Sequence, residues 1–210
     1  MDSRAATPWW MLGGSVAVLA VTWLMALPDS VSGAEEWVFR LFNDLPDWIE
    51  APGWPVMQLG AIAIVAVIML GVFLVWRRWQ ISAALGAAAL AGWALAKVIK
   101  ELVVRGRPDQ YLTEVNLRPE WEGLGFVSGH AAVAFAMATV VSPMLGRAGK
   151  AVVWTLAALT GLLRIYTAAH LPLDVVGGAA LGVAVGAVAL LVLQAVTGAE
   201  RAETETERAG

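Results

Sequence analysis

The sequence predicts an all-α membrane protein, a polytopic bundle of six transmembrane helices with one amphipathic helix at the membrane interface. Of its 210 residues, 59% are apolar and only 15% are charged, whereas soluble domains carry about 25% charged residues. Several apolar runs reach the roughly 18 residues that are needed to cross a bilayer. The length fits one compact bundle, so we expect a single domain over residues 1–198.

Six apolar segments are the expected spans. They cover residues 9–26, 56–76, 81–104, 129–145, 151–168 and 172–196. We expect the first to be a span rather than a signal peptide, because only Arg4 precedes it as a cation and Leu27-Pro28-Asp29 is not a small-x-small cleavage site. Many of the eleven tryptophans lie near span ends, as in an interfacial aromatic belt.

Two segments are predicted to lie outside the spans. Between the first two spans, residues 34–50 place Trp37, Leu41 and other apolar side chains at helical spacing, with Glu35 and Arg40 on the polar face. This pattern predicts an amphipathic helix on the membrane surface. The polar segment 199–210 is predicted to be a disordered cytoplasmic tail.

The loop charges predict the orientation. With both termini in the cytoplasm, the inside segments carry Arg77, Arg78, Arg147 and Lys150, as the positive-inside rule requires. The outside segments are then residues 29–55, 105–128 and 169–171. We therefore expect a multi-pass protein of the cell (plasma) membrane.

Ionisable residues within apolar spans, or at their ends, are costly and mark function by default. Here they gather at the outer ends of the third, fifth and sixth spans, and both histidines of the sequence also lie at outer span ends: Lys97, Lys100, Glu101, His130, Arg164, His170 and Asp174. Because an even number of crossings separates these ends, they lie on one side of the membrane. The sequence therefore predicts a basic, histidine-containing site on the outer face.

Most of these charged residues fall in three stretches of the sequence. Two of the three stretches are suited to binding a phosphate. Lys100-x6-Arg107-Pro108 supplies a point charge and a bidentate fork. In Ser128-Gly129-His130, Ser128 is expected to cap a helix, and the Gly129 amide would face an anion at the positive helix end. His130 lies in the first turn, where it is placed to donate a proton.

The third stretch, Arg164-x5-His170-x3-Asp174, adds a cation, an imidazole and a carboxylate. Pro172 is tolerated because it lies in the first turn of the last span. If that turn is helical, the side chains of His170 and Asp174 meet at i, i+4. A carboxylate bound to one ring nitrogen fixes the tautomer and leaves the other nitrogen free to attack.

These three stretches resemble the signature motifs of the type-2 phosphatidic acid phosphatase family, K-x6-R-P, P-S-G-H and S-R-x5-H-x3-D, in order and spacing. The family consists of membrane lipid phosphatases and their relatives, and its catalytic fold is shared with the vanadium haloperoxidases. The resemblance covers residues 97–174 in motif. Val127 and Leu163 replace the first residues of the second and third motifs, and neither change removes a side chain needed for the chemistry.

The resemblance implies a role for each residue. His170 would be the nucleophile and form a phosphohistidine, with Asp174 orienting it, and His130 would protonate the leaving lipid oxygen and then activate water. The phosphate-binding groups would be Lys100, Arg107, Arg164, Ser128 and Gly129. No metal ion and no cofactor is expected, because the cations themselves stabilise the phosphoryl charge.

The substrate stays open at this stage. An outward-facing site favours undecaprenyl or another polyprenyl pyrophosphate, and phosphatidylglycerophosphate or phosphatidate is the alternative. A lipid or anion transporter would use the same cations as an anion path, but it predicts interrupted spans in related halves, and the sequence has no such repeat. A catalytically inactive lipid-binding protein is disfavoured because no catalytic position is substituted.

Several residues outside the motifs have simpler interpretations. Lys97 either extends to the interface or belongs to the site, and Arg105 and Arg118 are expected to be solvated loop charges or lipid-headgroup contacts. The net charge of −3 gives no argument for a nucleic-acid partner, so the expected partners are the lipid substrate and membrane lipids. Small residues in the last span predict close helix packing: Gly177, Gly178, Gly182 and Gly186.

Overall fold

The computed structural model describes residues 9–118 and 122–209. Within these ranges every regular element is a helix, which confirms the predicted all-α class. The α-helices are α1 (Trp9–Ala26), α2 (Gly33–Asn43), α3 (Glu50–Gln58), α4 (Val65–Trp76), α5 (Trp79–Val103), α6 (Gly129–Val141), α7 (Arg147–Tyr166) and α8 (Pro172–Ala209).

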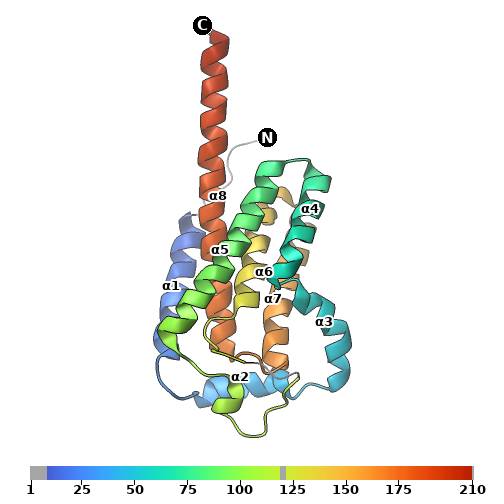
Figure 1. The fold of residues 1–210 in the computed structure, drawn as a ribbon, viewed down its shortest axis with the longest axis vertical. Helices are drawn as coiled ribbons and strands as arrows, with labels where there is room; N and C mark the ends of the chain where they lie inside the picture. Colours follow the sequence, from blue (N-terminus) through green and yellow to red (C-terminus); the bar gives the residue numbers. More distant parts are fainter. Residues whose placement is uncertain (1–8, 119–121, 210) are drawn as a thin grey trace.

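The long helices form a bundle, and α2 lies across one end of it (Figure 1). The segments that follow α5 and α7 lie at this same end. The beginning of α1 and the end of α8 lie toward the opposite end. The residues that the sequence assigns to one side of a membrane are therefore brought to one end of the bundle.

The described chain contains four helices that are long and apolar enough to cross a membrane: Trp9–Ala26, Trp79–Gln110, Arg147–Tyr166 and Pro172–Ala199. A bent pair, Asp47–Gln58 and Ile62–Trp76, makes a fifth if it is one span. In place of the predicted fourth span, residues 129–145, the structure has Gly129–Met144, an apolar helix shorter than the other candidates. Four or five spans therefore meet the length criterion, compared with the six predicted.

The segment predicted as a straight span over residues 56–76 is broken. Its two parts meet at 55°, with Gly60 in the gap. A Cβ built on Gly60 would lie 2.5 Å from the carbonyl oxygen of His130 and 2.8 Å from Cγ2 of Thr160. Glycine permits this close approach because it has no Cβ. The break is therefore a point of close contact between this segment and both α6 and α7.

α2 differs from the predicted surface helix in the residues that it buries. Ser32 caps it, its hydroxyl accepting a hydrogen bond from the Glu35 N–H at 3.2 Å. Its buried residues are Glu35, Phe39 and Asn43, spaced four apart, whereas Trp37 is 64% exposed. The assignment of Glu35 to the solvated face is therefore wrong: one face of α2, Glu35 included, packs against the protein.

The predicted close packing of the last span is present between α8 and α6. A Cβ built on Gly178 would lie 2.3 Å from the carbonyl oxygen of Ser128, and one on Gly182 would lie 2.4 Å from that of Ala132. One turn further, a Cβ on Gly186 would lie 2.6 Å from Cβ of Thr139. This row of glycines lets the two helix backbones touch.

α8 also differs from the prediction at its end. The sequence predicts disorder for residues 199–210, but the helix continues to Ala209. Alanine, glutamate and arginine are good helix formers, and a segment that extends an existing helix does not have to nucleate one.

Candidate active site

Four parts of the chain meet at the end of the bundle that α2 crosses (Figure 1). They are the end of α5 with the loop after it, the first turn of α6, the last turn of α7 and the turn that opens α8. In chain order they carry Lys100, Arg105, Arg107, Ser128, Gly129, His130, Arg164, His170 and Asp174.

His170 and Asp174 are buried side by side. His170 is 3% exposed and Asp174 is 0% exposed. Nδ1 of His170 lies 3.4 Å from Oδ2 of Asp174, close enough for a charge contact but outside hydrogen-bond geometry. The same Oδ2 accepts a hydrogen bond from the Leu171 N–H at 2.9 Å. Asp174 thus faces Nδ1 of His170.

Cations surround the imidazole of His170. Burial lowers the pKa of His170 well below its usual value, and the charges of Lys100, Arg164 and Arg107, in that order, lower it further. His130 is also near enough to contribute. His170 is therefore neutral at neutral pH, the form in which an imidazole nitrogen has a lone pair for attack.

Two of these cations also fix the loop before α6. Lys100 Nζ donates to the carbonyl oxygens of Leu124 and Gly125. Arg107 donates to the carbonyl oxygens of Glu122, Gly123 and Ala169. An ammonium has three N–H donors and a guanidinium has five, so both side chains keep donors for an anion.

Arg164, the third predicted cation, is buried at 3% exposure in the last turn of α7. Its Nη1 lies 3.5 Å from the sulfur of Met57 in α3.

Nowhere in the described chain do three or more His, Cys, Asp or Glu side chains come together as metal ligands.

The first turn of α6 supplies a cap, an open position and a half-buried imidazole. The Ser128 hydroxyl accepts from the Ala131 N–H at 3.5 Å. The Ser128 N–H donates to the carbonyl oxygen of Asp174 at 2.8 Å, so this amide ties α6 to α8 and, contrary to the sequence-based expectation, does not face a phosphate. A Cβ on Gly129 would meet nothing within 4 Å, which leaves space beside His130 for a ligand.

The environment of Arg105 differs most from its prediction. The prediction was a solvated or lipid-contacting charge, but Arg105 is 2% exposed. Its Nη1 lies 3.0 Å from Asp174 Oδ1, and its Nη2 lies 2.7 Å from Glu35 Oε2. One feature of the sequence set Arg105 apart: it is an arginine in a segment predicted to lie outside, where the positive-inside rule does not expect one. No signal pointed to Glu35, because its partner is 70 residues away.

The other charges of uncertain role lie outside the site. Lys97 stacks over the Trp93 ring, 3.9 Å from the ring centroid, and is exposed. Arg118 joins α2 to α7 by donating to the carbonyl oxygens of Asn43 and Tyr166, each at 2.9 Å. It also pairs with Asp47 at 2.9 Å. Arg118 is therefore a structural clamp rather than a solvated charge.

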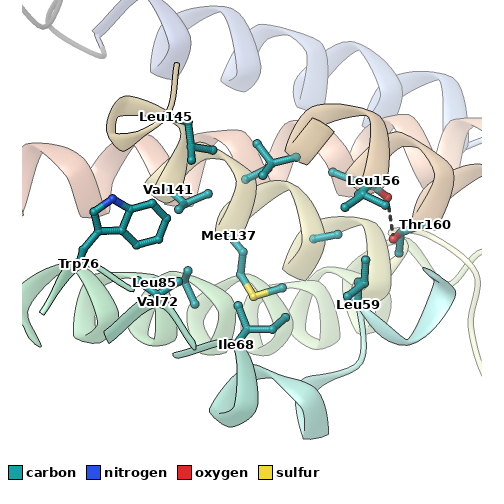
Figure 2. A pocket seen from close by; sticks show the side chains of 14 residues that line it. Leu59, Ile68, Val72, Trp76, Leu85, Met137, Val141, Leu145, Leu156 and Thr160 are labelled. Atoms are coloured by element: carbon teal, nitrogen blue, oxygen red, sulfur yellow. Dashed lines mark hydrogen bonds between the residues drawn. The ribbon is translucent and has the colours of Figure 1, made fainter. Parts of the chain in front are cut away.

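An apolar cavity of about 300 Å³ lies between α4, α5, α6 and α7. Figure 2 shows Leu59 and Thr160 at one end of it and Trp76 and Leu145 at the other. Thr160 is one helical turn before Arg164 on α7. The cavity therefore extends from just beneath the cationic site toward the opposite end of the bundle.

Several known proteins are similar to this chain. The family model described as the PAP2 superfamily matches residues 80–197. Decaprenylphosphoryl-5-phosphoribose phosphatase from two strains of Mycobacterium tuberculosis is 37% identical over 113 residues, 53% of this chain. The chain spans only 59% of the length of these relatives.

Two crystal structures have the same fold. Aquifex aeolicus LpxE superposes with a TM-score of 0.71 at 27% identity, over 78% of this chain and 98% of LpxE. A PAP2-type phosphatidylglycerolphosphate phosphatase from Bacillus subtilis gives a TM-score of 0.67 at 21% identity, over 87% of this chain and 94% of that one. The family match covers more than half of the sequence and includes all three motifs, so the chain belongs to the PAP2 superfamily.

Proposed function

We propose that this protein is an integral-membrane lipid phosphatase that hydrolyses a phosphomonoester or diphosphate lipid through a phosphohistidine at His170. The observation that carries the proposal is the surroundings of His170. A carboxylate faces one of its ring nitrogens, and three cations and a second imidazole lie near it. This arrangement suits attack on a group that carries several negative charges.

In the first step Nε2 of His170 attacks phosphorus, and the bond from phosphorus to the lipid oxygen breaks. Asp174 stabilises the positive charge that develops on the ring, because Oδ2 lies 3.4 Å from Nδ1. His130 gives its proton to the leaving oxygen. In the second step His130 takes a proton from water, the water oxygen bonds to phosphorus, and the N–P bond breaks.

The phosphoryl oxygens would be bound by Lys100, Arg107, Arg164 and the Gly129 amide. A phosphoryl group passes through a transition state with charge spread over its three outer oxygens, and preorganised cations stabilise that charge. Ser128 has a different role in this proposal. By capping α6 and donating to Asp174, it fixes the position of His130 relative to His170.

We further propose that six segments cross the membrane, with α3–α4 as one bent span and Gly129–Met144 as a short one. Arg77 and Arg78 lie between α4 and α5, and Arg147 and Lys150 lie in the first turn of α7. Both places are at the end of the bundle opposite the site (Figure 1). The positive-inside rule then gives cytoplasmic termini and an active site on the outer face of the cell membrane. The exposed tryptophans of α2 and its surroundings would lie at the outer interface: Trp37, Trp48 and Trp54.

For the substrate we propose a polyprenyl phosphate or diphosphate, with phosphatidylglycerophosphate or phosphatidate as the alternative. The cavity beneath the site is apolar and would receive part of a hydrocarbon chain. The relatives from M. tuberculosis carry a decaprenyl-linked substrate in their name, which supports a polyprenyl chain here. A transporter that used the same cations would bind the anion without cleaving it.

The test is phosphate release by the purified full-length chain. The substrates to compare are undecaprenyl diphosphate, phosphatidylglycerophosphate and phosphatidate, each with wild type and with His170→Ala. We expect release by wild type, fastest with the polyprenyl substrate, and none by His170→Ala. Release that His170→Ala retains, or no release from any lipid phosphate by folded wild-type protein, would refute the proposed activity.

A further inference from the structure

We infer that Glu35 and Arg105 are a positioning pair, which holds Asp174 so that one of its oxygens stays directed at His170. The inference deepens the proposed function, on which its catalytic meaning rests. It assigns a role in the site to α2, a helix that lies far from the three motifs in sequence and contributes nothing to them.

The contacts of the pair divide the two oxygens of Asp174 between different partners. Oδ1 accepts from Nη1 of Arg105 at 3.0 Å. Oδ2 accepts from the Leu171 N–H at 2.9 Å and faces Nδ1 of His170 at 3.4 Å. The oxygen that orients the imidazole is therefore the one that Arg105 does not bind.

Glu35 determines which N–H groups of Arg105 are available to bind Asp174. Glu35 takes Nη2 of Arg105 at 2.7 Å and also contacts Nη1 at 3.1 Å. A guanidinium otherwise prefers to bind a carboxylate through two parallel N–H groups. With Nη2 held by Glu35, Arg105 reaches only Oδ1. Without Glu35, Arg105 would be free to grip both oxygens of Asp174 and compete with His170 for Oδ2.

Burial makes these contacts difficult to replace by water. Glu35 is 6% exposed and Arg105 is 2% exposed, and a buried charge that loses its partner is strongly unfavourable. Glu35 also accepts from the Leu173 N–H at 3.0 Å. Asp174 and Glu35 thus occupy two amides at the start of α8, where negative charge is favoured, and α2 is fixed to the turn that carries His170.

Fixing α2 to the bundle does not by itself require this pair. Arg118 already joins α2 to α7 through the carbonyl oxygens of Asn43 and Tyr166, without contact to Asp174. The chain therefore offers a matched comparison of two buried or half-buried arginines that hold the same helix, of which only Arg105 touches the carboxylate of the site.

The variants to compare are Glu35→Gln and Arg105→Lys, with Glu36→Gln and Arg118→Lys as controls. Glu36 is the neighbour of Glu35 on α2, and its ion pair with Arg40 is partly exposed. We expect Glu35→Gln to lower kcat by roughly 10- to 100-fold, by analogy with metal sites, where loss of the groups that orient the ligands costs this much affinity or activity. KM should change little, because Glu35 does not touch the phosphate-binding cations. Arg105→Lys should lose kcat similarly, since lysine lacks the fork, and Arg118→Lys should lose thermal stability but keep kcat.

A second measurement does not depend on turnover. The chain has only two histidines, so ¹⁵N labelling of histidine gives a simple spectrum, and His170→Ala assigns it. We expect the His170 ring of wild type to carry its proton on Nδ1, and the ring nitrogen shifts to change in Glu35→Gln but not in Glu36→Gln, with His130 unchanged in both.

The outcomes separate the two proposals. Unchanged His170 shifts and wild-type kcat in Glu35→Gln would overturn the positioning role, as would a loss of kcat that appears equally in Arg118→Lys. If wild type releases no phosphate but the His170 shifts still respond to Glu35→Gln, the positioning pair stands and the proposed phosphatase function is wrong.

Discussion

Replacing Gly178 by alanine should displace the first turn of α6, which carries His130. A Cβ added at Gly178 would lie 2.3 Å from the carbonyl oxygen of Ser128, and ordinary contact begins at 3.4 Å. Relief of the overlap therefore requires a movement of about 1 Å, and a backbone oxygen at a helix cap cannot rotate away as a side chain does. Overpacking of this kind costs roughly 1–3 kcal/mol, and a misplacement of about 1 Å can lower a catalysed rate by about 10²-fold.

The assay pairs thermal unfolding in detergent with phosphate release, and the controls are other glycine-to-alanine changes. A Cβ at Gly71 in α4 would meet nothing within 4 Å, so Gly71→Ala should be neutral or stabilising by up to about 1 kcal/mol. A Cβ at Gly182 would lie 2.4 Å from the Ala132 carbonyl oxygen, one turn further from Ser128. Gly182→Ala should therefore lose a similar amount of stability but less activity. Equal kcat in the Gly178→Ala and Gly182→Ala variants, or wild-type behaviour of Gly178→Ala, would refute this reasoning.

Three further predictions concern the chemistry. In rapid-quench labelling with radiolabelled substrate, His170→Ala should form no phosphoenzyme. His130→Ala should accumulate an acid-labile phosphohistidine from a substrate with an activated leaving group, because hydrolysis of the intermediate lacks its base. Label on His170→Ala would contradict these roles. The rate of phosphoenzyme formation should stay level as the pH falls through 6.5 and decline only at lower pH, because burial and the nearby cations lower the pKa of His170. A decline centred above pH 6.5 would contradict this lowered pKa. Activity should survive EDTA, since the proposed site stabilises phosphate charge with Lys100, Arg107 and Arg164, and loss of turnover restored by Mg²⁺ or Zn²⁺ would show that a metal takes part.

The position of the charged residues at one end of the bundle was predictable because two physical rules act on the sequence directly. Apolar length defines a span, and an even number of crossings brings span ends to the same side. Lys100, His130, Arg164 and Asp174 therefore gather at one end of the bundle, as expected. The glycine contacts of α8 were likewise predictable, because spacing of four places small residues on one helix face.

The contacts that join distant segments were not predictable. Periodicity assigned Glu35 to the polar face of α2, but it does not identify what that face meets, and its partner Arg105 lies in a loop without periodicity. The break at Gly60 depends on close contact with α6 and α7, which the hydropathy of the segment does not reveal. The Ser128 amide was expected to bind phosphate only because of the resemblance to the family motif; it donates to the carbonyl oxygen of Asp174 instead.

The cavity between α4, α5, α6 and α7 has a consequence for handling the protein. The cavity is open on one side and its lining is apolar, so contact of this lining with water is unfavourable. Bilayer hydrocarbon that enters the cavity keeps the lining out of water and so contributes to holding the fold together. Extensive delipidation during purification should therefore lower the unfolding temperature, and re-addition of long-chain lipid should restore it.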